Sequence, residues 1–300
     1  MTVLATVVEV GVATVQDSGR GGYQRIGVPV AGAWHRLRYE SACRLLHDTV
    51  DAGMPAVELL AGSLQLRFSA DAAVAAVGSA TLTIDNRPVA TGTVVHVHPG
   101  ELLALEAEGP TYLTVSGWSE AHTLGSCSTD TFSGLGGRVL AVGDELRGEP
   151  VEDLADRVGT FQRSVPDALG PIRVVAFRQS MASDFFTRRW IVQRRSRSGI
   201  RLRSAGWAGP AGSVDSMPVL PGTVQVTPDG EAIVLGPDGG LTGGYPVVGV
   251  VASADLDRLS LVRDDESLAF ALTDAPTARA AWATRQRRLL KSFANPRDIA

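Results

Sequence analysis

Apolar residues along most of the chain either alternate with polar ones or form short runs, which is the pattern of β-strands. In the first half this pattern predicts strands at Val3–Val15, Ser63–Phe68, Ala80–Ile84, Val94–His98, Leu102–Glu106 and Thr111–Val115. In the second half it predicts strands at Ile172–Val175, Gly199–Leu202, Gly222–Val226, Ala232–Leu235 and Val247–Ser253. Closely spaced strands separated by turn sequences predict a mainly β fold built as barrels or sandwiches.

Three segments carry a helical period instead. They are Trp34–His47, Ser183–Trp190 and Ala278–Phe293. The last of them is basic and has one apolar stripe. Such a helix suits either a docking role toward a partner or a place on the surface of its own domain, and both interpretations are open.

The strand pattern breaks in a polar, acidic and proline-containing stretch between Gly143 and Pro171. We therefore predict a first β unit at 1–150, a connector at 151–171, and a second β unit at 172–300 that ends in the basic helix. Gly21–Val28 and Gly243–Val250 share the pattern GGYxxxGV, which is compatible with two related β units. Glycine-rich turns also recur by chance, so a common origin stays open.

The composition, 44% hydrophobic and 20% charged over 300 residues, is that of a globular protein with a buried core. No run approaches the roughly 20 apolar residues that a membrane helix needs, and the amino terminus lacks the basic start of a signal peptide. We therefore expect a cytoplasmic protein that enters no membrane. A net charge of -4 with scattered basic residues argues against nucleic acid as a partner.

Cysteine and lysine usage restrict the chemistry further. Cys43 and Cys127 form no CxxC pair, which excludes a zinc ribbon or a thioredoxin-like motif but leaves one disulfide open. Lys291 is the only lysine, so a phosphate-binding loop of the GxxxxGK type is excluded and a central Schiff-base lysine is disfavoured. If the reaction uses ATP, the nucleotide binds at a non-standard site or on another chain.

Two short polar motifs favour ordinary structure over chemistry. Strand alternation places His96 and His98 on one face, but no Cys, Asp or Glu follows at ligand spacing, so we predict solvent-facing histidines and no metal site. Ser126 or Cys127 would act as a nucleophile only with a histidine and an acid beside it. The sequence assigns no such partners, so we expect a loop there.

The segment Thr242–Pro246 is the most informative one. Its adjacent glycines allow the backbone to approach a ligand closely, although a glycine bulge in a sheet is the alternative. On the strand upstream, alternation places Thr223 and Gln225 on one face.

These stretches resemble the KipA-like family, whose members are the C subunits of prokaryotic 5-oxoprolinase. The family is also called allophanate hydrolase subunit 2 and is related to biotin-dependent carboxyltransferases. Pro218–Leu235, Asp238 and Thr242–Gly249 look like the family block PVxPGTxQVPPDGxPIVLxxDxxTTGGYPxIG. Thr14–Ala33 resembles its opening TxQDxGRxGYxxxGVPxSGAxD, and Glu58 lies in a run similar to ALExxxxGPxL. The resemblance follows the family's order over most of the chain.

The resemblance implies two cyclophilin-like β-barrel units and one half of a two-subunit enzyme. The expected partner is a KipI-like protein, also called allophanate hydrolase subunit 1, and a LamB/YcsF-like protein is a further candidate. In this family the complex opens the small cyclic amide 5-oxoproline to glutamate and consumes ATP. The alternatives are a catalytically degenerate regulatory partner and the carboxyltransferase half of a biotin-dependent urea or amide carboxylase.

Position in the family motifs also gives the candidate site. The predicted catalytic residues are Arg20, Tyr23, Arg197, Thr242 and Tyr245, and the predicted substrate-binding residues are Gln225, Asp238, Gly243 and Gly244. Arg20 and Arg197 are expected to bind anionic groups, while the backbone N–H groups of the two glycines orient a carbonyl. Gln16 and Asp17 match as well, and Asp17 suits a turn cap. We expect the residues from these distant stretches to converge in one pocket.

Several family positions have lost polar groups in this chain. His35 stands where the family has the aspartate of GAxD, and Ser196–Leu202 replaces DRMGYRL without its acid and aromatic residues. Asp238–Val247 lacks the usual glutamine and lysine. These losses weigh against the carboxyltransferase alternative and favour the regulatory one.

Overall fold

The computed structural model describes residues 1–47, 49–151, 157–162, 170–177, 184–209 and 214–294. The chain divides into two compact units. Unit 1 comprises Met1–Arg20, Ala31–Val165 and Leu289–Ala300, and unit 2 comprises Gly21–Val30 and Pro166–Arg288. Each unit therefore includes one segment that is distant in sequence from the rest of that unit: Leu289–Ala300 in unit 1 and Gly21–Val30 in unit 2.

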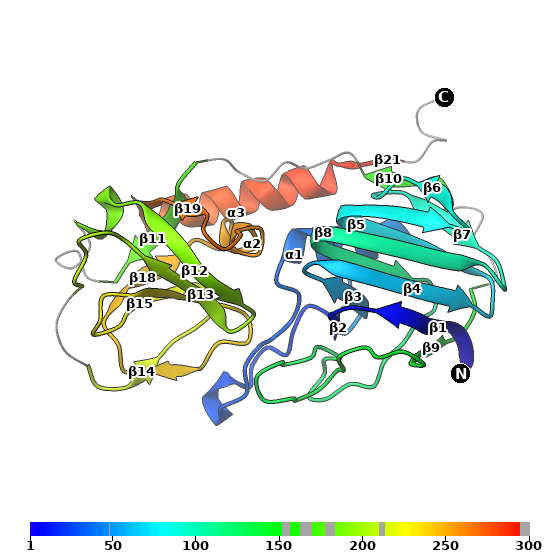
Figure 1. The fold of residues 1–300 in the computed structure, drawn as a ribbon, viewed down its shortest axis with the longest axis horizontal. Helices are drawn as coiled ribbons and strands as arrows, with labels where there is room; N and C mark the ends of the chain where they lie inside the picture. The colour runs from blue at the N-terminus through cyan, green and yellow to red at the C-terminus, as the bar shows by residue number, and fades with distance from the viewer. Residues whose placement is uncertain (48, 152–156, 163–169, 178–183, 210–213, 295–300) are drawn as a thin grey trace. The chain divides into compact units, whose positions relative to one another are not determined.

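Unit 1 is built on a nine-stranded antiparallel sheet (Figure 1). Its strands are β1 (Thr2–Val10), β2 (Ala13–Gln16), β3 (Ala56–Leu59), β4 (Gly62–Phe68), β5 (Ala72–Ile84), β6 (Arg87–Val89), β7 (Val94–Val97), β8 (Leu102–Val115) and β9 (Glu145–Gly148). The main path runs β2-β3-β8-β4-β1-β9, and β5 pairs with β6, β7 and β8. Alternate residues of these strands, such as Leu64, Leu66 and Phe68, face one apolar core.

Helix α1 (Arg36–Leu46) covers part of this sheet and confirms the predicted helix at Trp34–His47. It packs on β5 and β8. Leu45 and Leu46 meet Ala73, Ala75 and Val94, so the sheet is buried on both faces at this point. The helical spacing of its apolar residues produced this contact, because residues three and four apart share one face of a helix.

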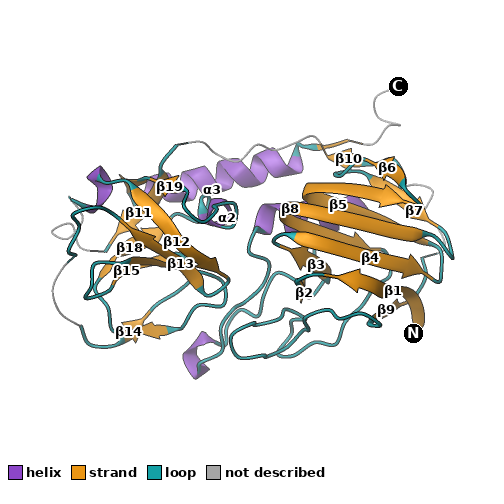
Figure 2. Cartoon of the chain, viewed as in Figure 1, coloured by secondary structure: helices purple, strands orange, loops and turns teal. Residues whose placement is uncertain are grey.

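Unit 2 contains an eight-stranded sheet of order β19-β12-β13-β16-β15-β18-β11-β20. These strands are β11 (Ile172–Ala176), β12 (Trp190–Ser196), β13 (Gly199–Arg203), β15 (Thr223–Val226), β16 (Ala232–Leu235), β18 (Val247–Val251), β19 (Ser267–Leu268) and β20 (Phe270–Thr273). The pair β11–β20 is parallel and the other pairs are antiparallel. The expectation of a mainly β fold is thus confirmed, with a half-barrel and a nearly closed barrel (Figure 2).

Short elements complete the described chain. They are β10 (Phe161–Gln162) paired with β21 (Phe293–Ala294), β14 (Met217–Pro218) paired with β17 (Thr242–Gly243), α2 (Leu256–Leu259), α3 (Ala275–Leu290), and 3-10 turns at Gln24–Ile26 and Phe185–Thr187. The predicted connector at 151–171 is described only in part, and β10 lies in it. None of the described helices is long and apolar enough to span a membrane.

Several expected elements differ from the structure. The strands predicted at Leu102–Glu106 and Thr111–Val115 form the single strand β8, and the one predicted at Ala80–Ile84 is the end of the longer β5. The strand predicted at Val3–Val15 is two strands, because the chain turns at Gly11, whose N–H donates to Ser63 O at 2.9 Å. The helix predicted at Ser183–Trp190 is wrong over its described part, where one 3-10 turn is followed by β12; Ser183 lies outside the described residues. Phe185 and Trp190 instead stack in the core of unit 2 with ring centroids 4.6 Å apart, and their burial outweighs the helical period.

The basic helix predicted at Ala278–Phe293 is observed as α3, shifted by about three residues at each end. Arg285 Nη2 lies 2.6 Å from Asp257 Oδ2 of α2, a carboxylate that is almost fully buried. This ion pair fastens α3 to α2 within unit 2, and both interpretations of the basic helix stay open.

Candidate functional site

The carboxylate of Asp17 organises the polar interior of unit 1. It is fully buried and accepts hydrogen bonds from Ser126 Oγ at 2.7 Å, Gly19 N at 2.7 Å and Cys127 N at 2.8 Å, as well as from Ser128 Oγ. These bonds fasten the loop Gly125–Thr129 to the end of β2. Asp17 therefore has a structural role: it caps its own turn and also holds the loop Gly125–Thr129 in place.

The thiol of Cys127 is poorly suited to act as a nucleophile. Burial raises the pKa of the Cys127 thiol, and the nearby Asp17 carboxylate raises it further, so the thiol stays protonated. Cys43 and Cys127 are both free and buried, so the disulfide that the sequence left open does not form. The predicted interpretation as an ordinary loop agrees with this chemistry.

Arg20 lies in the same interior and has 1% of its surface exposed. Its Nη2 donates to Ser128 O and its Nε to Thr123 O at 3.5 Å. Its Nη1 is buried and, among the described residues, has no hydrogen-bond partner. The glycine loop closes tightly on this group, since a Cβ at Gly136 would stand 2.1 Å from Arg20 Nη2. A buried guanidinium N–H without an acceptor is a candidate anion donor.

Helix α1 begins at a position where this chain departs from the family motif. His35 Nδ1 accepts from Arg38 N at 3.3 Å and so caps the helix, the role that an aspartate would have there. The residue before it is fixed as well, because Trp34 N donates to Glu58 Oε2 at 2.9 Å. Glu58, which matches the family motif, is buried and also accepts from Tyr112 Oη at 2.5 Å. The change from Asp to His thus keeps the cap and its support.

In unit 2, Arg197 and Asp238 are partners of each other. Arg197 Nε and Nη2 each lie 2.8 Å from one carboxylate oxygen of Asp238, which is a two-pronged ion pair. The two residues are 6% and 1% exposed. The pair clamps the β12–β13 turn to the loop after β16, and the backbone adds Asp238 N to Arg197 O at 3.1 Å. The structure therefore brings these two predicted residues together, and their buried ion pair supports the β12–β13 turn.

Gln225 is the predicted residue with the most distinctive surroundings. It lies in β15 with 4% of its surface exposed, and its Nε2 is buried with no partner among the described residues. Gly243 lies directly against it, because a Cβ there would stand 2.2 Å from Gln225 Nε2. A side chain at Gly243 would therefore collide with this amide, so glycine is required at that position. The pairing of β14 with β17 holds Gly243 in place, with Met217 as its direct partner.

Gln225 and Tyr245 line one cavity of about 390 Å³ in unit 2. The rest of its lining comes from Arg194, Ser196, Ser198, Gly199, Arg201, Ile233, Leu235 and Gly240. Arg197 is absent from this lining although both its neighbours contribute. Tyr245 is 39% exposed, Thr242 is exposed, and Gly243 and Gly244 are half-buried.

Two arginines of this cavity were missed by the sequence argument. Arg194 and Arg201 lie on the β12–β13 hairpin, and Arg201 Nη1 also forms an ion pair with Glu231. Alternation in the sequence groups Arg201 with Arg203 on one face of β13, but only the register of the hairpin, which pairs Arg194 with Arg201, brings the two cavity arginines together. Tyr23 belongs to the segment Gly21–Val30 of unit 2 and is half-buried. Arg20 is assigned to unit 1, so the predicted convergence of all these residues stays a prediction.

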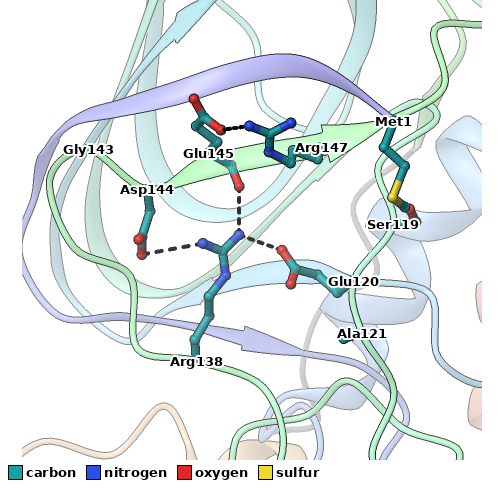
Figure 3. A pocket seen from close by; sticks show the side chains of 9 residues that line it. All are labelled: Met1, Ser119, Glu120, Ala121, Arg138, Gly143, Asp144, Glu145 and Arg147. Atoms are coloured by element: carbon teal, nitrogen blue, oxygen red, sulfur yellow. Dashed lines mark hydrogen bonds and ion pairs between the residues drawn. The ribbon is translucent and has the colours of Figure 1, made fainter.

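A second cavity, in unit 1, has about 480 Å³ and is lined mainly by charged residues (Figure 3). Arg138 lies at its centre, with Nη2 2.5 Å from Glu120 Oε1 and 2.8 Å from the backbone oxygen of Glu145, and Nη1 3.4 Å from Asp144 Oδ2. Arg147 pairs with the Glu145 carboxylate. Because the charges of the lining already pair with one another, this cavity is better suited to holding β9 in place than to binding an ion.

His96 of β7 and His98, the residue just after this strand, lie beside a carboxylate that no local spacing in the sequence indicates. His96 and His98 have a carboxylate beside them after all, since Asp71 Oδ1 lies 2.9 Å from His98 Nδ1 and 3.3 Å from His96 Nε2. Asp71 is 25 positions before His96 in the chain, so no local ligand spacing reveals it. Only the pairing of β5 with β7 brings the three side chains together.

Comparison with known proteins agrees with this architecture. The family model described as carboxyltransferase domain, subdomain A and B, matches residues 26–272. The chain is 30% identical to the 5-oxoprolinase C subunit of Haemophilus influenzae, over 86% of this chain and 87% of the relative. It is also 30% identical to the protein of the same name from Escherichia coli K12, over 91% and 92%. Urea amidolyase of Saccharomyces cerevisiae is 29% identical over 86% of this chain but 16% of its own length.

Solved structures give the same result. The crystal structure of TTHA0988 matches with a TM-score of 0.80 and 28% identity, over 90% of this chain and 56% of that one. The Kluyveromyces lactis urea amidolyase matches with a TM-score of 0.80 over 96% of this chain and 20% of that one; its 23% identity speaks for the fold alone. The chain therefore belongs to the carboxyltransferase domain family of subdomains A and B.

Proposed function

We propose that this chain is the C subunit of an ATP-dependent 5-oxoprolinase and that it opens a cyclic amide only in complex with a KipI-like protein. The proposal rests on the share of each relative's length that the chain matches. The chain covers 87% and 92% of the two relatives named as 5-oxoprolinase C subunits, but 17% and 16% of the two urea amidolyases. The chain therefore matches most of the length of the first enzyme's C subunits but only one region of the second enzyme.

The cavity beside Gln225 supplies the groups that opening an amide requires. Attack on the amide carbonyl places negative charge on its oxygen, and a preorganised N–H donor lowers the energy of that state. Gln225 Nε2 is such a donor, since it is buried and has no acceptor among the described residues. Arg194 and Arg201 add positive charge to the same cavity, which suits the carboxylate of 5-oxoproline.

We propose different roles for the remaining predicted residues: some contact the substrate and others hold the cavity in shape. Tyr245 lines the cavity and contacts the substrate, whereas Thr242, Gly243 and Gly244 lie outside its lining, and Gly243 supports the amide of Gln225 from behind. Arg197 and Asp238 position the β12–β13 turn whose serines reach the cavity. In unit 1, Arg20 offers its buried Nη1 to an anionic group, and Tyr23 stays a catalytic candidate.

ATP is proposed to bind with the help of the KipI-like partner. This chain has one lysine, Lys291, and no phosphate loop that would hold a nucleotide by itself. A LamB/YcsF-like protein is the further partner that such a complex would include. Biotin would be required only if the chain acted as a carboxyltransferase.

The test is reconstitution with the partner proteins. Co-expression of this chain with the KipI-like and LamB/YcsF-like proteins of the same genome should give a hetero-complex that co-elutes in size-exclusion chromatography. That complex should release glutamate from 5-oxoproline only when ATP is present. Gln225→Leu should lower turnover about 100-fold, because one oxyanion donor is lost, while the complex still forms. Arg203→Ala, at an exposed position of β13 outside the cavity lining, is the control and should keep full turnover.

Other outcomes of this experiment would support a different function for the chain. Chains that elute separately would refute the two-subunit model. A stable complex with no turnover would favour a regulatory partner, for which the lost acid and aromatic residues of Ser196–Leu202 are the supporting observation. Turnover of urea that depends on bicarbonate and a biotinylated protein would identify a carboxyltransferase instead.

A further inference from the structure

We infer that Asp71, His96 and His98 of unit 1 form a binding site for a divalent transition-metal ion of the zinc type. Each of the three side chains offers one ligand atom, and these atoms all lie within 4.8 Å of one another. None of the three residues belongs to the cavities described above. The inference is therefore independent of the proposed function.

Strand pairing places the three side chains on one face. In the antiparallel pair β5–β7, Ala72 lies opposite Val97 and Ala73 opposite His96. The next step of this register puts Asp71 opposite His98, and His96 diagonal to Asp71. Residues in these relations on one face have side chains within reach of each other, whereas Ala72 and Val97 point to the core on the other face.

Helix α1 explains why this cluster is open to solvent. Val94 and Ala73, on the same face of the pair, pack under Leu45 and Leu46 of the helix. Further along the strands the helix no longer covers the sheet, and side-chain exposure rises from 33% for His96 to 59% for His98, with 55% for Asp71. An ion can reach the cluster from water and keep one or more water ligands.

The distances fit a shared ion. Asp71 Oδ1 lies 2.9 Å from His98 Nδ1 and 3.3 Å from His96 Nε2. Ligand bonds of about 2.0–2.1 Å in a tetrahedral arrangement require ligand atoms about 3.4 Å apart, so small side-chain rotations suffice. His96 Nε2 is itself buried and, within the described chain, makes no hydrogen bond. Its nitrogen therefore points into the cluster without another acceptor or donor to satisfy it.

The backbone under the ligands is held firmly. His98 N donates to Glu101 Oε2 at 2.8 Å, and Glu101 N donates back to His98 O at 3.1 Å. On the other strand, Ala73 N donates to Ser116 Oγ at 2.9 Å and its carbonyl accepts from Ser116 N at 2.8 Å. Binding would therefore fix side-chain rotamers and leave the strands unchanged, which keeps its entropic cost low.

The donor set selects the class of ion. Two imidazoles and one carboxylate suit Zn²⁺ and its neighbours Co²⁺, Ni²⁺ and Cu²⁺, whereas Mg²⁺ and Ca²⁺ prefer oxygen ligands alone. With neutral imidazoles the cluster carries one negative charge, which attracts a divalent cation. Three protein ligands leave at least one position for water or for a donor from another molecule.

The experiment is zinc titration of the untagged full chain by isothermal calorimetry after treatment with a chelator. We expect saturable binding of one Zn²⁺ per chain. His96→Gln, His98→Gln and Asp71→Asn should each weaken the affinity at least about tenfold, because each removes one of three ligands. His122→Gln is the matched control, since this exposed histidine contacts Gly53 O instead, and its affinity should equal that of the wild type.

Two further readouts separate ligation from misfolding. Co²⁺ should give the d–d absorption bands of a low-coordinate site with the wild type and lose them with His98→Gln, while the circular dichroism of the variant stays that of the wild type. Zinc should raise the unfolding temperature of the wild type and of His122→Gln by the same amount, and that of the cluster variants by less. A wild-type chain that binds no stoichiometric zinc, or cluster variants that bind as tightly as the wild type, would overturn the inference.

Discussion

At the scale of single residues, the ion pair between Arg197 and Asp238 is the feature that most changes the sequence-based interpretation. Arg197 was expected to bind an anionic substrate, yet its Nε and Nη2 already face the two oxygens of a buried carboxylate. Both groups are removed from water, so their charges depend on each other for compensation. Removing one partner leaves the other buried and uncompensated.

Arg197→Ala should therefore act first on stability. We expect the free energy of unfolding to fall by about 3–5 kcal/mol, the typical cost of breaking a buried pair from one side. The double variant Arg197→Ala/Asp238→Asn should recover part of this loss, because it also removes the stranded charge. Arg203→Ala, whose guanidinium forms exposed pairs with Asp229 and Glu231, should change the value by no more than about 1 kcal/mol. Urea unfolding measures all of them, and an Arg197→Ala protein as stable as the wild type would contradict the assignment.

At the scale of secondary-structure elements, α1 shows how a departure from a family motif can preserve a structural role. The helix starts after His35, whose ring nitrogen accepts the N–H of Arg38. A helix start leaves several N–H groups without partners, and any side-chain acceptor at this position satisfies one of them. Histidine and aspartate are both able to do this, but alanine is not.

His35→Ala should lower the free energy of unfolding by about 0.5–2 kcal/mol, the usual cost of losing a helix cap. His35→Asp, which restores the family residue, should remain more stable than His35→Ala, because its carboxylate accepts the same N–H and is favoured near a helix N-terminus. Thermal unfolding of the three proteins at neutral pH provides the comparison. The cap assignment fails if the aspartate variant proves less stable than the alanine variant.

At the scale of the whole molecule, the dependence of stability on pH follows from buried carboxylates such as Asp255. Its burial alone would raise the pKa of this carboxyl, but hydrogen bonds from the side chain and backbone N–H of Arg173 and the charge of Arg258 lower it below its usual value. A carboxyl with a depressed pKa in the folded state adds stability above its unfolded pKa of about 3.9. That contribution is lost as the pH falls through the lower folded value.

Asp255→Asn should therefore be less stable than the wild type at pH 7, by about 1.5–3 kcal/mol, because it weakens charge-assisted hydrogen bonds to the partly exposed Arg173. The difference should persist at about pH 5 and shrink steadily below about pH 4, because there the carboxyl of the unfolded chain takes up a proton while the folded carboxyl stays ionised until a lower pH. Urea unfolding at a series of pH values gives this difference directly, and the other carboxyls cancel because both proteins share them. A difference that stays constant or grows on acidification would show that Asp255 titrates normally.

The fold itself could be predicted largely from local pattern. Alternation located β4, β7, β13 and β16, and helical spacing located α1 and α3, because these signals reflect which face of each element is buried. The pattern failed at Phe185–Trp190, where an aromatic cluster with Phe270 decided the conformation. Family membership was likewise visible in the sequence, since the motifs around Asp17 and Thr242 keep their order and spacing.

By itself, the sequence determined the mainly β class, the positions of most strands, the family, and the residues that match its polar motifs. The tertiary structure alone decided what those residues touch. It paired Arg197 with Asp238, placed Gly243 against the amide of Gln225, and brought Asp71 to His96 and His98. Local pattern depends on neighbours within one turn or one pleat, whereas these contacts join residues 18 to 41 positions apart and depend on strand register, which a single sequence leaves open.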